Sequence, residues 1–131
     1  MILGIGIDLV EVKRFKKWVQ NPAIIRRYFN QKEMISDLDG SLTDRQCSAM
    51  SQHYAVRFAA KEAFSKAMGT GISGFELKDV FVQNEESGKP YLVLENSAKK
   101  LFEEKCPDAK IFLSLSHEKE YAIAYAIVQR S

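Results

Sequence analysis

The sequence predicts an α+β fold in which a mostly antiparallel sheet packs against one long central helix. Residues 44–68 contain neither glycine nor proline, follow a capping-box sequence and end at a glycine, which predicts the helix. Four short segments nearer the C-terminus have the patterns of strands, two of them alternating apolar and polar residues, and pair as two hairpins. The chain has 131 residues, the length of one domain, so we expect a single domain over residues 1–131.

The N-terminal part predicts a strand followed by two short helices. Residues 2–8 form a short apolar run bounded by charge, which predicts a buried strand. Residues 11–19 carry apolar side chains at helical spacing. Asn21-Pro22 supplies a cap and a first-turn proline for a second helix, which we expect to end near Phe29. The polar residues 36–42 predict a loop.

The central helix has clear signals at both of its ends. Thr43 and Gln46 have the spacing of a capping box, which places the N-terminus of the helix after Thr43. Gly69 directly follows Met68 and is a natural C-terminal stop. A helix of this length is long for a small domain, so we expect it to be the scaffold.

The remainder of the chain predicts strands with one further helix. Residues 77–83 and 90–95 predict one hairpin, and residues 97–105 suit a helix. A second hairpin is predicted from residues 111–116 and 121–128.

Composition excludes some classes of function. The chain has 19 Lys and Arg against 17 Asp and Glu, and a net charge of +2 is too small to indicate nucleic acid as a partner. Basic residues nevertheless gather in the first thirty positions. They predict a surface that meets an acidic protein or a phosphate, but a solvated helix face explains them equally well. These basic residues are Lys13, Arg14, Lys16, Lys17, Arg26 and Arg27.

The cysteines and the N-terminus bear on where the protein works. Cys47 and Cys106 lack metal-type spacing, so we expect two free thiols in a reducing compartment. The N-terminal apolar run has no basic leader and is too short to span a membrane. We therefore expect a soluble, cytoplasmic protein with no membrane partner.

Asp8 is out of place at the end of an apolar strand. A carboxylate there is costly unless it caps a helix, meets a cation or binds a metal. A cap on a helix that begins near Val10 and a metal site are both open at this point.

Residues 57–66 of the central helix form a cluster of charges among alanines. Arg57 and Lys61 are four residues apart, as are Glu62 and Lys66, so each pair shares a helix face. Ordinary pairs on a solvated face are the commoner explanation. However, two phenylalanines flank the charges closely, which places part of the cluster near the core.

Two further segments have weaker signals. Residues 114–117, Ser-Leu-Ser-His, suit a phosphate or a ribose, and a structural histidine in a turn is the alternative. No Gly-x-Ser-x-Gly elbow is present, so nucleophilic serine chemistry is not expected. The glycine-rich residues 69–74 follow a helix and lack the Gly-Lys-Ser/Thr ending of a phosphate-binding loop, and most such stretches only terminate helices.

The order of these motifs resembles the holo-acyl-carrier-protein synthase family over essentially the whole chain. The residues that carry the resemblance are 4–11 (Gly-Ile-Gly-Ile-Asp-Leu-Val-Glu), 57–67 (Arg-Phe-Ala-Ala-Lys-Glu-Ala-Phe-Ser-Lys-Ala), 69–72, 88–90 (Gly-Lys-Pro) and 113–117. The segment from about Asp37 to Ser51 fits least well.

The resemblance implies the 4′-phosphopantetheinyl transferase fold and a reaction. A serine of an apo acyl carrier protein attacks coenzyme A, takes its 4′-phosphopantetheine group and releases 3′,5′-ADP. Asp8 and Glu62 match the carboxylates that hold Mg²⁺, a hard cation that prefers oxygen ligands. Glu62 is also the candidate acceptor of the serine proton, and Lys66 would stabilise charge on the leaving group.

The resemblance also assigns the coenzyme A and carrier contacts. Arg57, Lys61 and His117 are candidates for the 3′-phosphate and adenosine end, with Ser116 and Gly71 as further contacts. The carrier protein would be met by basic residues, Arg14, Arg26 and Arg27. Family members of this length form homotrimers with coenzyme A between subunits, and residues 121–128 suit a subunit contact or plain core.

Two other functions are alternatives to a phosphopantetheinyl transferase. A Mg²⁺-dependent phosphohydrolase also uses paired carboxylates, but it normally needs more of them than the sequence offers. A non-catalytic module that binds a carrier protein needs only the basic residues. It does not require Asp8, Glu62 and Lys66 together.

Overall fold

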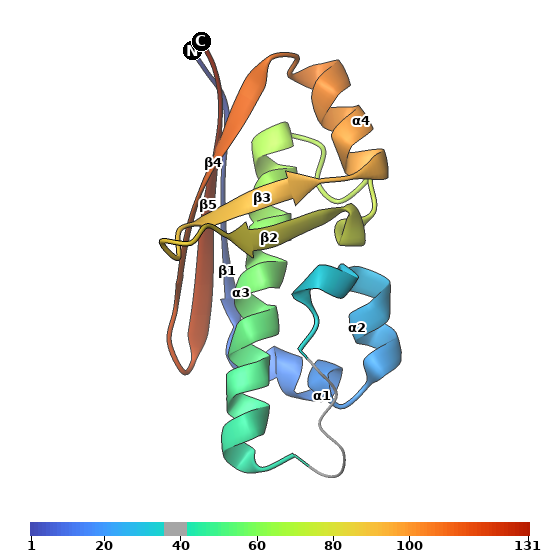
Figure 1. Ribbon diagram of the computed structural model, residues 1–131, viewed down its shortest axis with the longest axis vertical. Coiled ribbons are helices and arrows are strands. Elements are labelled where there is room, and N and C mark those ends of the chain that lie inside the picture. The colour runs from blue at the N-terminus through green and yellow to red at the C-terminus, as the bar shows by residue number, and fades with distance from the viewer. Residues whose placement is uncertain (36–41) are drawn as a thin grey trace.

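The computed structural model describes residues 1–35 and 42–131, and it has the predicted α+β class (Figure 1). Two antiparallel sheets pack around the long helix α3; one has three strands in the order β1-β5-β4 and the other pairs β2 with β3. The elements, with η for short 3-10 helices, are β1 Ile2–Glu11, η1 Val12–Phe15, α1 Lys16–Val19, α2 Pro22–Tyr28, η2 Gln31–Glu33, α3 Asp44–Met68, η3 Leu77–Asp79, β2 Val80–Asn84, β3 Pro90–Leu94, α4 Asn96–Lys105, β4 Ala109–His117 and β5 Tyr121–Arg130.

Helix α3 begins and ends where the sequence predicts. The Thr43 hydroxyl accepts a hydrogen bond from the backbone N–H of Gln46, and the Gln46 side chain accepts one from the N–H of Thr43. Gly69 has φ of 74° and closes the helix in the left-handed region. The predicted capping box and glycine stop are therefore confirmed.

Small side chains bring α3 unusually near the three-stranded sheet. Alternate residues of β5 turn toward the helix, and its alanines at 122, 124 and 126 are fully buried against alanines of α3. Strand β1 comes closest of all. A Cβ placed on Gly6 would lie 1.8 Å from the carbonyl oxygen of Ala63, and one on Gly4 would lie 1.9 Å from that of Ala67. Glycine is therefore required at both positions for β1 to lie against the helix.

The prediction of a buried strand over residues 2–8 is only half right. The strand extends to Glu11 and lies at the edge of its sheet. One of its faces is covered by α3, and the other is uncovered in the protomer. Ile5, Ile7 and Leu9 are each at least half exposed on that uncovered face. An apolar run does not by itself distinguish a core strand from one that presents a second apolar face.

Other differences lie at the ends of elements. Residues 11–19 form η1 and α1 rather than one helix, and residues 77–79 form η3 before the strand begins. Asn21 precedes α2 as predicted, although its side chain makes no capping hydrogen bond. The loop predicted for residues 36–42 lies, except for Leu42, outside the described residues.

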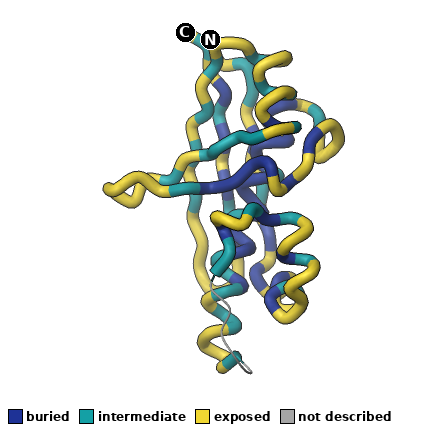
Figure 2. Tube along the Cα trace, turned by 45° about the vertical axis from the view of Figure 1, so that its right-hand side comes forward, coloured by how far each residue is buried: buried dark blue, intermediate teal, exposed yellow. Residues whose placement is uncertain are grey.

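The β2–β3 hairpin crosses in front of α3 in the view of Figure 1, and its strand β3 also contacts β4 of the three-stranded sheet. Its strand β2 is buried along Val80, Phe81 and Val82, whereas the turn over residues 84–88 is exposed and projects from the molecule (Figure 2). Within the described residues, no helix is long and apolar enough to cross a membrane.

Candidate active site

The contact between β1 and α3 brings together Asp8 and Lys66, which are 58 residues apart in the sequence. The Lys66 ammonium donates hydrogen bonds to Asp8 Oδ1 at 3.1 Å and to the backbone oxygen of Ile7 at 3.0 Å. The Asp8 side chain is only 13% exposed, whereas that of Lys66 is 52% exposed. The lysine thus reaches from solvent to a carboxylate at the sheet edge.

The second oxygen of this carboxylate, Asp8 Oδ2, is buried and has no hydrogen-bond partner. Asp8 lies within β1, opposite Ala124, and the strand continues for three further residues, so Asp8 does not cap a helix near Val10. An unpartnered buried carboxylate oxygen is costly. The arrangement has a place for a cation beside Asp8.

Glu62 lies close enough to Asp8 for the two charges to interact. Burial raises the pKa of the Glu62 carboxyl, and the negative charge of Asp8 raises it further, while Lys66 and Arg14 act in the opposite direction. Arg14 is itself held against aromatic rings, with its guanidinium carbon 5.2 Å from the centre of the Phe58 ring. The site therefore holds two carboxylates flanked by two cations.

These carboxylates could bind one hard divalent cation. Within the described residues, no group of three or more His, Cys, Asp or Glu side chains is placed to hold a metal. Two carboxylates are nevertheless the usual protein contribution to a Mg²⁺ site whose other ligands are phosphate oxygens and water.

Lys61, predicted as a coenzyme A ligand, has a structural role instead. Its ammonium is fully buried and donates hydrogen bonds to Glu33 Oε1 at 2.6 Å and to the backbone oxygens of Leu77 and Val80. All three ammonium protons are engaged inside the protein, so none is available to a phosphate. The prediction that Lys61 contacts coenzyme A is therefore wrong. The spacing of Lys61 from Arg57 in the sequence does not reveal the buried partner of Lys61.

Arg57 lies on a different side of α3 from the carboxylate pair. It is five residues from Glu62, which corresponds to about 140° around the helix axis. Its guanidinium donates to the backbone oxygen of His53 at 3.2 Å, its Nε is buried without a partner, and burial lowers its pKa. His117 meets another side of the helix, where its Nδ1 lies 3.0 Å from Oε1 of Gln52, a residue about 140° around the axis from Arg57. Arg57 and His117 both act on the pKa of His53, and these three residues are called the second polar cluster below.

The remaining predicted residues are spread over the surface. Ser116 is exposed and, because side chains alternate along β4, points to the uncovered sheet face while His117 points toward α3. Gly71 is exposed after the helix, with φ of 61°. Arg26 and Arg27 are exposed in the last turn of α2.

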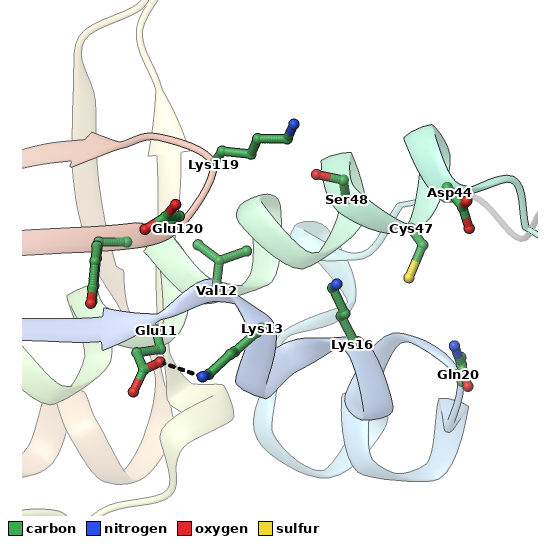
Figure 3. Close-up of a pocket in the computed structure, with 11 residues that line it drawn as sticks. Glu11, Val12, Lys13, Lys16, Gln20, Asp44, Cys47, Ser48, Lys119 and Glu120 are labelled. Atoms are coloured by element: carbon green, nitrogen blue, oxygen red, sulfur yellow. Dashed lines mark ion pairs between the residues drawn. The ribbon is translucent and has the colours of Figure 1, made fainter.

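A pocket of about 880 Å³ lies at the opposite end of β1 from the chain terminus (Figure 3). Its walls come from η1 and α1, the first turns of α3 and the turn between β4 and β5, and they include Lys16, Ser48 and Lys119. Neither Asp8 nor Glu62 lines it. The carboxylate pair therefore lies outside this pocket, where β1 meets α3.

Sequence reasoning missed three residues that organise this region. Glu33 joins η2 to α3 and β2, because its carboxylate also accepts from the backbone N–H groups of Asn30 and Val82. Asn30 and Glu33 form a capping box, and that spacing was a usable signal. Gln52 and His53 lie on α3 and carried no signal of their own.

Comparison with known proteins points to one family. The sequence profile of the 4′-phosphopantetheinyl transferase superfamily matches residues 4–126. A Treponema denticola protein named holo-[acyl-carrier-protein] synthase is 48% identical over 129 residues, which cover 98% of this chain and 99% of the relative. A Geobacter protein of the same name is 42% identical over 136 residues, covering 99% of this chain and 100% of the relative.

Solved structures of the same kind share the fold. A holo-(acyl-carrier-protein) synthase from Bacillus anthracis, in complex with CoA (3′,5′-ADP), superposes with a TM-score of 0.75 at 32% identity and covers 100% of this chain and 99% of that one. The acyl carrier protein synthase of Plasmodium yoelii with ADP bound gives a TM-score of 0.85 at 33% identity, with coverage of 100% and 97%.

Proposed function

The chain belongs to the 4′-phosphopantetheinyl transferase superfamily, and we propose that its reaction takes place at Asp8, Glu62 and Lys66. The enzyme moves the 4′-phosphopantetheine group of coenzyme A to a serine of apo acyl carrier protein. The serine oxygen forms a bond to the pantetheine-side phosphorus, the bond from that phosphorus to the bridging oxygen breaks, and 3′,5′-ADP leaves.

The observation that carries the assignment is the unpartnered, buried Oδ2 of Asp8 beside Glu62. Asp8 and Glu62 fit a Mg²⁺ ion, since a carboxylate pair with a free oxygen is the donor set that this ion takes. When bound, Mg²⁺ would neutralise negative charge on the pyrophosphate of coenzyme A. Catalysis of this kind rests on positioning and on charge stabilisation more than on covalent chemistry.

The protein side chains have separate roles in the transfer. Glu62 accepts the serine proton, directly or through a water, and its raised pKa suits a proton acceptor. Lys66 lies one turn further along α3, where its half-exposed ammonium stabilises the charge that develops on 3′,5′-ADP. Asp8 is held in place by Lys66.

We assign the 3′-phosphate and adenosine end of coenzyme A to the second cluster, with Arg57 and His117 as its main ligands. Arg57 lies on another side of α3 from the carboxylate pair, and we propose that a neighbouring protomer supplies the contacts at one end of the same coenzyme A. Ser116, whose side chain points to the uncovered sheet face, and Gly71 are further contacts that we expect a neighbouring subunit to bring to the same ligand.

An assembly is supported by the uncovered sheet face. Apolar side chains from all three strands lie on it, and a monomeric protein rarely exposes so continuous a patch. They include Ile5, Ile7, Leu9, Phe112, Tyr121 and Tyr125. We propose that this face is the subunit contact of a homotrimer.

The carrier protein would dock on the basic helices α1 and α2. Arg14 links this surface to the reaction centre, because it acts on the Glu62 charge and packs on Phe58. Arg26 and Arg27 extend the positive surface and would steer an acidic partner. The charged carrier would serve fatty acid biosynthesis, and the free thiols of Cys47 and Cys106 suit a cytoplasmic location.

The test is an intact-mass measurement of apo acyl carrier protein incubated with the enzyme, coenzyme A and Mg²⁺. We expect a gain of one phosphopantetheine group, which EDTA abolishes. Asp8→Ala and Glu62→Ala should abolish transfer while carrier binding persists. Transfer that survives EDTA, or either substitution, refutes the metal assignment. Binding without transfer by the wild-type enzyme would favour the non-catalytic module.

A further inference from the structure

Helix α2, on which the carrier protein is proposed to dock, has few anchors of its own. Of its seven described residues only Ile25 is buried, and Arg26 and Arg27 in its last turn are exposed. Asn21 before it makes no side-chain capping hydrogen bond, and the packing contacts of the helix are chiefly with α1 and η3. The direction in which α2 presents its arginines therefore depends on the chain that follows it.

Residues 29–35, here called the η2 segment, connect α2 to the core through contacts with neighbouring elements. Phe29 is buried and packs edge-on against Tyr54 of α3, with 4.9 Å between the ring centres. The Tyr54 hydroxyl accepts a hydrogen bond from the backbone N–H of Ile35 at 3.0 Å. The Asn30 side chain donates to a backbone oxygen of η3 at 3.1 Å. The η2 segment is therefore held at both of its ends.

Glu33, in the middle of this segment, is held by two side chains of α3. Lys61 donates to its carboxylate at 2.6 Å, and Nε2 of His53 lies 2.6 Å from its backbone oxygen. His53 and Lys61 are eight residues apart, which places them about two turns apart along the helix. The side chain and the main chain of one residue are thus fixed at two points along α3. Loss of either contact leaves the segment free to pivot about the other.

The contact with Glu33 defines the state of the His53 ring. A carbonyl oxygen only accepts hydrogen bonds, so Nε2 must carry the proton and donate. Burial lowers the pKa of His53 to about 4, so the ring is neutral near pH 7. In the neutral ring Nδ1 then carries a lone pair and cannot donate to a phosphate oxygen. Within the second polar cluster, the His53 side chain therefore serves the η2 segment rather than coenzyme A.

We propose that His53 is a positioning residue for the carrier protein, because its Nε2–H holds the main chain of Glu33 and so fixes the direction of α2. Arg26 and Arg27 then face the carrier before it binds, and the carrier binds more tightly because the helix is already ordered. The statement about the carrier rests on its proposed docking at α2, whereas the statement that His53 holds α2 does not.

The hold on α2 can be measured without substrates, from the exchange of its backbone amide hydrogens. His53→Phe keeps an aromatic ring but removes the donor, and His53→Gln keeps an N–H donor at the position of Nε2. Amides of residues 24–35 should exchange about fivefold faster in His53→Phe, the change expected for one lost hydrogen bond. They should exchange at the wild-type rate in His53→Gln. Unchanged exchange in His53→Phe overturns the proposal.

The consequence for the carrier is measured by steady-state transfer from coenzyme A to apo acyl carrier protein. His53→Phe should raise KM for the carrier about fivefold, with kcat and KM for coenzyme A unchanged, and His53→Gln should restore the wild-type KM. Gln31→Leu is the matched control and should behave as wild type, because the exposed Gln31 side chain of η2 makes none of these contacts. A rise in KM for coenzyme A, or a fall in kcat, would indicate general disruption and contradict a role in positioning.

A double-mutant cycle shows whether His53 acts through the arginines. Replacing Arg26 and Arg27 together with alanine should raise the carrier KM about fivefold in the wild type, because two exposed charge contacts are lost. In His53→Phe the same replacement should raise it by less than about twofold, since the arginines are no longer held toward the carrier. Effects that multiply fully in the triple variant refute action through α2.

The outcomes separate this proposal from the proposed function. A wild-type protein that does not transfer phosphopantetheine overturns the function and the carrier part of the proposal, while amide exchange still reports whether His53 holds α2. Normal transfer with an unchanged carrier KM in His53→Phe overturns the positioning role and leaves the function intact. An unchanged carrier KM after replacement of both arginines in the wild type overturns docking at α2.

Discussion

Replacing Lys61 with methionine should lower the free energy of unfolding of the protein without weakening its binding of coenzyme A. The side chains of Lys61 and Glu33 are both fully buried, with 2.6 Å between the ammonium and the carboxylate. Methionine fills a similar volume but leaves the Glu33 carboxylate buried with only two backbone N–H donors. It also leaves the carbonyl oxygens of Leu77 and Val80 without this donor.

The cost follows from the partner left behind. Breaking a buried ion pair by removing one member costs about 3–5 kcal/mol, because the remaining charge is uncompensated. We therefore expect Lys61→Met to lower the free energy of unfolding by about 4 kcal/mol. At about 4 °C per kcal/mol for a chain of this size, the midpoint of thermal unfolding falls by about 15 °C.

A double-mutant cycle separates this cost from simple loss of packing. Glu33→Gln added to Lys61→Met removes the uncompensated charge, so the double variant should regain about 2 kcal/mol relative to Lys61→Met. Lys78→Met is the matched control. Its ammonium makes a 3.5 Å ion pair with Glu76 and is 51% exposed, so its loss should change stability by less than about 0.5 kcal/mol.

Urea unfolding gives the stabilities, at one protein concentration because assembly contributes to apparent stability. Steady-state transfer, measured at a temperature where the variant is folded, gives KM for coenzyme A. We expect the KM of Lys61→Met to equal that of the wild type. A variant of wild-type stability with a raised KM would restore Lys61 as a ligand and refute the reasoning from burial.

Three further perturbations test the proximity of β1 to α3, the buried histidine and the uncovered sheet face. Gly6→Ala places a methyl group 1.8 Å from the Ala63 carbonyl oxygen, so it should lower the free energy of unfolding by about 3 kcal/mol. It should also abolish transfer by displacing Asp8, and unchanged activity would contradict the close approach of β1 to α3. Burial, aided by Arg57, lowers the pKa of His53 from 6.5 to about 4, so the neutral ring is favoured in the folded state. Stability should be complete above pH 6.5 and fall by up to about 3 kcal/mol as pH drops to 4, and His53→Gln should remove that slope in acid unfolding curves. Tyr125→Glu places a charge on the uncovered face and should convert trimers to monomers in sedimentation velocity; an unchanged mass would locate the subunit contact elsewhere.

The parts of the fold that sequence predicts well are those with local causes. The ends of α3 depend on Thr43, Gln46 and Gly69, which act within one turn of the helix end they define. The proximity of Asp8 and Glu62 could also be expected from the sequence, because a carboxylate in an apolar strand and another among alanines are both unusual. The two carboxylates come together because Gly4 and Gly6 let β1 lie against α3. The need for glycine at these positions is evident only in the structure, where the helix backbone lies beside them.

The predictions that failed depend on contacts between distant residues. Lys61 and Lys66 are alike in the sequence, each four residues after a charged neighbour, yet Lys61 is enclosed by Glu33, 28 residues away, and Lys66 reaches Asp8. The apolar run of β1 likewise conceals that one face meets α3 and the other is uncovered. Neither distinction follows from spacing, because each depends on which element packs on the other side.

The polar side chains of the motif over residues 57–66 point in three directions from one helix and do not form a single site. Lys61 turns inward to Glu33, Glu62 and Lys66 turn to the edge of β1, and Arg57 turns to the cluster of His53. Residues five apart differ by about 140° around a helix, so Arg57 and Glu62 of one protomer face different ligand surfaces. If one coenzyme A uses both chemistries, as proposed, a neighbouring subunit would supply one of them. The uncovered sheet face is then the surface that would hold the two halves of the proposed site in register.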